Sequence, residues 1–99
     1  MMQPVFRPLF AHYAVVIQEM TVEFTSHEFI ARLAQEHQRE YIEALAAYRQ
    51  RQSPFKAVHS ILARHLNDFV PELIVQDGPA IDPDIFGDLC SCAKWRKVG

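Results

Sequence analysis

The stretch FTSHEFIARLAQEHQREYIEALAAYRQR, residues 24–51, decides the fold expected of this chain. Thr25 and Glu28 form the T-x-x-E pattern of a capping box, in which each side chain binds the backbone N–H of the other residue. Phe24 and Phe29 flank the box at the spacing of a hydrophobic staple. Apolar side chains then recur at the spacing of one helical face, at Ile30, Leu33, Ala34, Tyr41, Ala44, Leu45 and Tyr48. The pattern predicts one long helix over residues 26–50.

A second helix is predicted over residues 54–69. Ser53 is a good N-cap, and Pro54 fits the first helical position because the N–H that proline lacks has no partner there. One face of this segment is apolar, at Phe55, Val58, Leu62, Leu66 and Phe69. Because the connection to the first helix is short, we expect the two helices to form an antiparallel helical hairpin.

The segment before the capping box has two interpretations. In the first, residues 13–24 form short strands, because Tyr13–Ile17 and Thr21–Phe24 are rich in β-branched and aromatic side chains. In the second, Met20 is the natural start, and residues 1–19 are a dispensable or poorly ordered extension. No cleavage site follows a continuous apolar run, and no run is long enough to span a bilayer, so neither a secretory signal nor a membrane span is expected.

The C-terminal third is expected to add a short strand or extended segment near residues 72–76 and a short helix over LCSCAKW, residues 89–95. The long helix overhangs the shorter one, which leaves Leu33 in need of cover. We expect Trp95 to fold back and supply that cover. A second copy of the chain, forming a homodimer, is the alternative. The predicted fold class is therefore mostly α, in one small domain of 99 residues.

Composition narrows the function classes. The net charge of −2 gives no whole-chain excess that would favour nucleic acid or an anionic membrane. The two cysteines are separated by one residue and do not make a disulfide framework. We expect free thiols in a reducing compartment, and hence a cytoplasmic protein.

Few residues are candidates for chemistry. His37 lies in the apolar face of the first helix, and His65 is expected opposite it, with Glu40 one turn along; these are the candidate metal ligands. The simpler interpretation is a buried His37 that is hydrogen-bonded to a carbonyl or to Tyr41. In a helix Cys90 and Cys92 would point apart, so they are not expected to share an ion. No catalytic motif or cofactor loop occurs, so we expect no enzyme, no cofactor and no small-molecule substrate.

The leading functional expectation is a protein-binding module that binds a partner protein or a second copy of itself. The runner-up is a small nucleic-acid-binding regulator, because basic residues gather around the interhelical turn and around an aromatic side chain at the C-terminus. This candidate interaction surface comprises Arg49, Arg51, Lys56, Arg64, Lys94, Trp95, Arg96 and Lys97. A metal-binding helical protein is the third expectation.

Overall fold

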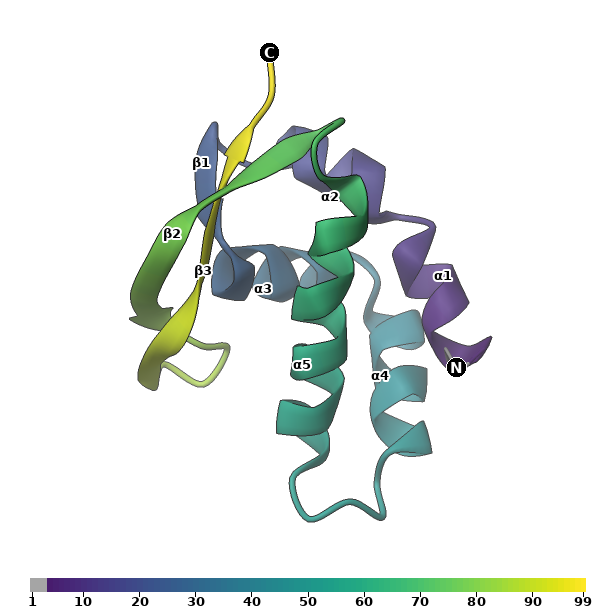
Figure 1. The fold of residues 1–99 in the computed structure, drawn as a ribbon. Helices are drawn as coiled ribbons and strands as arrows, with labels where there is room; N and C mark the ends of the chain where they lie inside the picture. Colours follow the sequence, from purple (N-terminus) through teal and green to yellow (C-terminus); the bar gives the residue numbers. More distant parts are fainter. Residues whose placement is uncertain (1–3) are drawn as a thin grey trace.

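The computed structural model describes residues 4–99 (Figure 1). Its α-helices are α1 (Arg7–Phe10), α2 (Tyr13–Glu19), α3 (Ser26–Glu36), α4 (Gln38–Ala47) and α5 (Pro54–His65). Its strands are β1 (Glu23–Thr25), β2 (Ile74–Pro83) and β3 (Leu89–Lys97). Short 3-10 turns cover Pro4–Phe6 and Leu66–Phe69.

The strands form one antiparallel sheet in the order β1-β3-β2 (Figure 1). Phe24 of β1 lies opposite Trp95 of β3, and both side chains are buried. The register between β2 and β3 shifts between Gln76 and Pro79. Gly78 lies in this bulge with φ of 87°, a backbone conformation that side-chain-bearing residues rarely adopt.

The expectation of a mostly α fold with a C-terminal helix is wrong. The chain is mixed α/β, and within the described residues the segment 89–97 is strand β3 rather than a helix. The loop from Asp84 to Asp88 turns the chain back on itself. The Asp84 carboxylate accepts from the backbone N–H groups of Phe86 and Asp88, and Gly87 takes φ of 86°. These are the features of a tight turn, and they hold β2 and β3 in a hairpin.

The prediction of a single long helix over residues 26–50 is also wrong, because the helix breaks at His37. This residue has φ of −130° and ψ of 58°, so α3 ends before it and α4 begins after it. The predicted start is confirmed. Thr25 and Glu28 form the complete capping box, and the rings of Phe24 and Phe29 lie 6.2 Å apart. The second helix is confirmed over 54–65, with Pro54 at its first position and a 3-10 turn in place of its predicted end, but the Ser53 side chain makes no capping hydrogen bond.

The predicted strands within residues 13–24 are replaced largely by a helix. Residues 13–19 form α2, and only residues 23–25 are extended as β1. Short helices from this N-terminal part supply much of the core through the buried side chains Phe6, Leu9, Tyr13, Val16 and Ile17. The expectation of a dispensable extension covers residues 1–19, of which Met1–Gln3 lie outside the described part.

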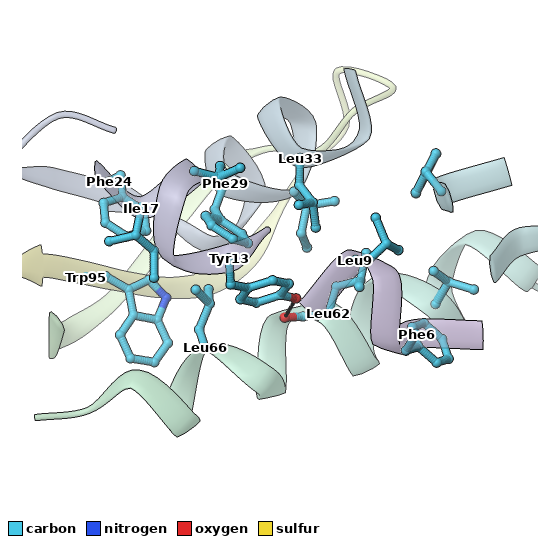
Figure 2. Close-up of a cluster of buried hydrophobic side chains, with 14 of the residues drawn as sticks. Phe6, Leu9, Tyr13, Ile17, Phe24, Phe29, Leu33, Leu62, Leu66 and Trp95 are labelled. Carbon is cyan, nitrogen blue, oxygen red and sulfur yellow. Dashed lines mark hydrogen bonds between the residues drawn. The ribbon is translucent and has the colours of Figure 1, made fainter. Parts of the chain in front are cut away.

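The core fills the space between the N-terminal helices, α3, α5 and the sheet (Figure 2). Trp95 is buried as expected, and its indole N–H donates to the hydroxyl of Ser26 over 2.9 Å. Predicted core positions that are buried are Ile30, Leu33, Tyr41, Val58, Leu62 and Leu66. Leu45 and Tyr48 are only partly buried, and Phe55 stays 40% exposed. Among residues 4–99 no helix has the length and apolarity to cross a membrane.

Candidate functional site

A cleft of about 920 Å³ lies between α5 and the β2–β3 hairpin. Residues from the start of α3 line one end of it, and Trp95 contributes to the sheet side. Figure 1 shows α5 and the hairpin, the two elements that form its opposite walls. This volume falls within the range of about 300–1,000 Å³ that is typical of the pockets in which proteins bind small molecules and cofactors.

The α5 wall carries polar side chains that donate hydrogen bonds. Lys56, Ser60, Arg64 and Asn67 recur at the spacing of one helical face, and all four are exposed. The Arg64 Nε–H donates to the carbonyl oxygen of Ser60 over 3.3 Å, which holds the guanidinium along the helix. This wall therefore has two cations and a row of donors facing the cleft.

The hairpin wall has the opposite charge. The hairpin residues that line the cleft include the carboxylates of Asp84 and Asp88 and neither Lys nor Arg. Burial alone would raise the pKa of Asp84, but the N–H groups of Asp88 and Phe86 bind its carboxylate, so the pKa falls below its ordinary value. Asp84 is therefore a carboxylate anion at neutral pH.

An exposed aromatic pair bridges the two walls at the rim. Phe86 in the hairpin loop packs edge to face against Phe55 in the first turn of α5, with ring centroids 4.8 Å apart. Phe86 nevertheless remains 59% exposed. Phe55 and Phe86 together thus leave adjoining aromatic surface in water beside the cleft.

His59 lies at the inner side of α5 and is half-buried. Burial lowers its pKa, and the Asp84 carboxylate opposes this effect in part. Burial also raises the pKa of Tyr41 to about 12. The phenol thus keeps its proton at neutral pH, and its oxygen forms a 2.6 Å hydrogen bond with Nε2 of His59. This bond joins α4 to α5 behind the cleft.

His27 and Cys90 form a second pair in the lining of the cleft. His27 Nδ1 lies 2.9 Å from the carbonyl oxygen of Asp82, so Nδ1 carries the proton and donates to it. In the neutral imidazole Nε2 is then an acceptor, and it lies 3.8 Å from Sγ of the exposed Cys90, whose thiol also donates to the carbonyl oxygen of Asp88 over 3.7 Å. Burial raises the pKa of the neighbouring Cys92 thiol. The arrangement places a thiol next to a base of fixed tautomer.

Sequence reasoning missed this pair because its members are 63 positions apart and the segment around Cys90 was assigned to a helix. It also missed His59, which lies on the flank of α5 and belongs to no motif. The period-two spacing of Cys90 and Cys92 is a local signal for a strand, in which both side chains face the same side of the sheet.

The predicted basic surface divides into separate groups. Lys56 and Arg64 lie on the cleft wall, as described above. Arg49 and Arg51 lie in the exposed connection between α4 and α5, where the Arg51 guanidinium stands 5.2 Å from the centre of the Tyr48 ring.

The C-terminal members of that surface have partners inside the fold. Arg96 pairs with Glu23 and Asp77 across the sheet, and Lys94 also pairs with Asp77. The Lys97 ammonium donates to the carbonyl oxygens of Gln18 and Met20, each over 2.9 Å. Trp95 is buried and offers no exposed ring. The aromatic at the centre of the predicted surface is therefore a core residue.

The predicted metal ligands His37 and His65 have different neighbours. The His65 ring stacks on Phe10 at 3.5 Å, and its Nδ1 lies 3.2 Å from the Asp68 carboxylate. The His37 ring stacks on His12 at 3.6 Å. Glu40, predicted beside His37, completes a group in which ligand atoms of His12, His37 and Glu40 all lie within 4.8 Å of one another.

Comparisons with protein-family models, with curated proteins and with solved structures gave no significant match for this chain.

Proposed function

We propose that this domain binds a segment of another protein in the cleft between α5 and the β2–β3 hairpin, without carrying out a chemical step. The observation that supports this most directly is the combination of an open cleft, two walls of opposite charge and an exposed aromatic rim. Hydrophobic and aromatic anchors set in a polar surround are typical of protein interfaces.

The charge distribution favours a polypeptide over nucleic acid. A phosphate backbone needs a surface of continuous positive charge. Here Lys56 and Arg64 face a hairpin whose Asp84 and Asp88 would repel phosphate groups. A polypeptide carries both signs of charge, and its backbone carbonyls match the donors of Ser60 and Asn67. The matching occupant is a short segment with an acidic residue toward α5, a basic residue toward the hairpin and an apolar side chain at the Phe55–Phe86 rim.

Backbone pairing with the sheet contributes little to this mode of binding. The outer edge of β2 carries Pro79 and Pro83 and is interrupted by the bulge at Gly78. Proline and bulges block the addition of a further strand. Recognition therefore depends on side chains in the cleft. The free thiols of Cys90 and Cys92 fit a protein of a reducing compartment such as the cytoplasm.

The experiment is selection of a phage-displayed library of random peptides on the immobilised full chain, followed by affinity measurements with synthetic copies of the enriched peptides. We expect enriched peptides with an apolar anchor and mixed charge. Phe86→Ser should weaken their binding by about 10-fold or more, as for an aromatic hot spot. Arg64→Glu should weaken the peptides that carry an acidic residue.

Ile42→Ser is the matched control, because Ile42 is a 61% exposed apolar residue on α4 that does not line the cleft. Its peptide affinity should equal that of the unmodified chain. Peptides that bind all variants equally would place binding elsewhere and overturn the proposal. Tight, salt-sensitive binding of mixed-sequence DNA or RNA that Arg64→Glu abolishes would replace it with the nucleic-acid function.

A further inference from the structure

We propose that His12, His37 and Glu40 form a binding site for a divalent transition-metal ion of the zinc type. Two imidazoles and a carboxylate place their ligand atoms within 4.8 Å of one another, and all three residues are half-buried. None of the three residues lines the cleft, so the group is separate from the proposed peptide site.

The fold brings these residues together by means of the helix break. His37 is the residue between α3 and α4, and its non-helical backbone redirects the chain there. Glu40 follows one turn later in the first turn of α4, where side chains three positions apart lie on the same face. His12 immediately precedes α2, and its ring stacks on that of His37 with an angle of 10° between the ring planes.

The donor set indicates which class of ion fits. Zinc binds imidazole nitrogen and carboxylate oxygen at about 2.0–2.2 Å, so the ligand atoms of a loaded site lie closer together than 4.8 Å. The His12 and His37 rings are stacked in nearly parallel planes, so at least one imidazole must rotate out of the stack before both nitrogens can point to one ion. Two imidazoles favour zinc, nickel or copper over magnesium and calcium, which prefer ligand sets made of oxygen atoms. Three protein ligands leave a fourth position of a tetrahedral zinc ion for water.

The ligands come from separate parts of the chain, which gives the ion a structural consequence. His12 belongs to the N-terminal helices, whereas His37 and Glu40 belong to the junction of α3 and α4. A bound ion would tether the N-terminal helices to this junction. Because it binds the folded chain and not the separated ligands, it should raise the temperature of unfolding, and the rise should grow with the logarithm of the free zinc concentration once that exceeds the dissociation constant.

The test is isothermal titration of zinc chloride into the full chain, prepared without a polyhistidine tag and freed of metal by a chelator. Cys90→Ser and Cys92→Ser are included in every variant, so that the thiols do not bind zinc. We expect one ion per chain and a rise in the melting temperature. Loss of a residue that only supports a metal ligand typically reduces metal affinity by about 10–100-fold. Glu40→Gln and His12→Gln should each reduce the zinc affinity by more than that, because each removes a ligand.

Both substitutions keep the approximate size of the side chain, so circular dichroism should show unchanged folding before metal is added. His65→Gln is the matched control, because His65 contacts Phe10 and Asp68 and not the proposed ligands. Its zinc affinity should stay unchanged. Absence of zinc binding by the parent, or equal binding by the parent and the Glu40→Gln variant, would overturn the proposal. Neither result would bear on peptide binding in the cleft.

Discussion

The hydroxyl of Tyr13 donates a 2.6 Å hydrogen bond to the backbone carbonyl oxygen of Leu62, and both residues are fully buried (Figure 2). This bond joins α2 to α5 through the centre of the core. Burial raises the pKa of the phenol well above its ordinary value, so Tyr13 remains a donor throughout the neutral range. The Tyr13 ring also packs against Phe29 and Phe69.

The position of Tyr13 predicts that removal of residues 1–19 abolishes cooperative folding. The deletion removes five fully or nearly fully buried side chains: Phe6, Leu9, Tyr13, Val16 and Ile17. Truncation of a single large core residue costs about 2–5 kcal/mol, while a whole domain is stable by about 5–15 kcal/mol. Circular dichroism melts measure the effect.

Tyr13→Phe serves as the mild comparison for that deletion. It keeps the ring and removes one hydrogen bond, which should cost about 0.5–1.5 kcal/mol. If the chain that begins at Met20 melts cooperatively at the temperature of the full chain, residues 1–19 are dispensable, as the second interpretation of the sequence holds.

Thr25 is expected to contribute more stability than an ordinary N-cap. Its hydroxyl accepts from the N–H of Glu28 over 3.1 Å and donates to the Asp82 carboxylate over 2.7 Å. The residue thus caps α3 and also fastens β2 to the start of that helix. Thr25→Ala should cost about 2 kcal/mol, the upper end of the range for a lost cap.

Thr25→Ser keeps both hydrogen bonds and should cost little in comparison. Urea unfolding measures the loss of stability in Thr25→Ala, in Asp82→Ala and in the double variant. Comparison of the three losses gives the interaction free energy between Thr25 and Asp82. Strictly additive losses would show that the bond between Thr25 and Asp82 contributes nothing.

The helical part of this fold was predictable where local signals determine it. The capping box at Thr25 and the Ser53–Pro54 start depend on adjacent residues, so the sequence alone locates both helix starts. The break at His37 was not predictable, because the same apolar spacing continues on both sides of it. A polar side chain in the middle of an apolar face is the one trace that the break leaves in the sequence.

The C-terminal hairpin was missed because it projects from the core. A strand is recognised by alternation of buried and exposed residues. In β3 only Trp95 is fully buried, and in β2 only Ile74. The half-buried positions of β2 include Asp77 and Asp82, whereas Ile81 is exposed, so burial does not follow an apolar–polar alternation in the sequence. The Asp84–Gly87 turn was a further sequence signal for the hairpin.

The candidate sites were beyond prediction for a different reason, since the pairs His27–Cys90 and His12–His37 join residues that are distant in sequence.

We expect His59 and His65 to make the folded chain less stable in mild acid. Burial lowers the pKa of His59 and of His65, and Asp84 and Asp68 respectively oppose this only in part. The unfolded chain therefore binds these protons more readily than the folded chain. Above the unfolded pKa of about 6.5 both states are neutral and nothing changes. As the pH falls through that value, stability falls by up to about 1.4 kcal/mol per pH unit for each proton.

Urea unfolding between about pH 8 and about pH 5 measures this slope. The double variant His59→Gln, His65→Gln should show a shallower fall than the parent chain over the same range. The two proteins share every other ionisable group, so the difference between the two slopes belongs to His59 and His65. Equal slopes would mean that neither residue resists protonation in the folded state.

The two cysteines should differ in reactivity although one residue separates them. Cys90 is exposed, and its Sγ faces the Nε2 acceptor of His27 at 3.8 Å. Cys92 is partly buried, and burial raises the pKa of its thiol. The thiolate is the form that reacts with alkylating agents. We therefore expect iodoacetamide to label Cys90 first, as measured by mass spectrometry of digested protein over time.

His27→Phe tests whether the imidazole contributes to that reactivity. It removes the acceptor and keeps an aromatic ring, so labelling of Cys90 should slow while labelling of Cys92 stays close to its rate in the parent. Urea-unfolded protein supplies the intrinsic rates, because both thiols are then fully exposed. A Cys90 rate that His27→Phe leaves unchanged would show that exposure alone explains its reactivity, and that the contact between His27 and Cys90 does not activate the thiol.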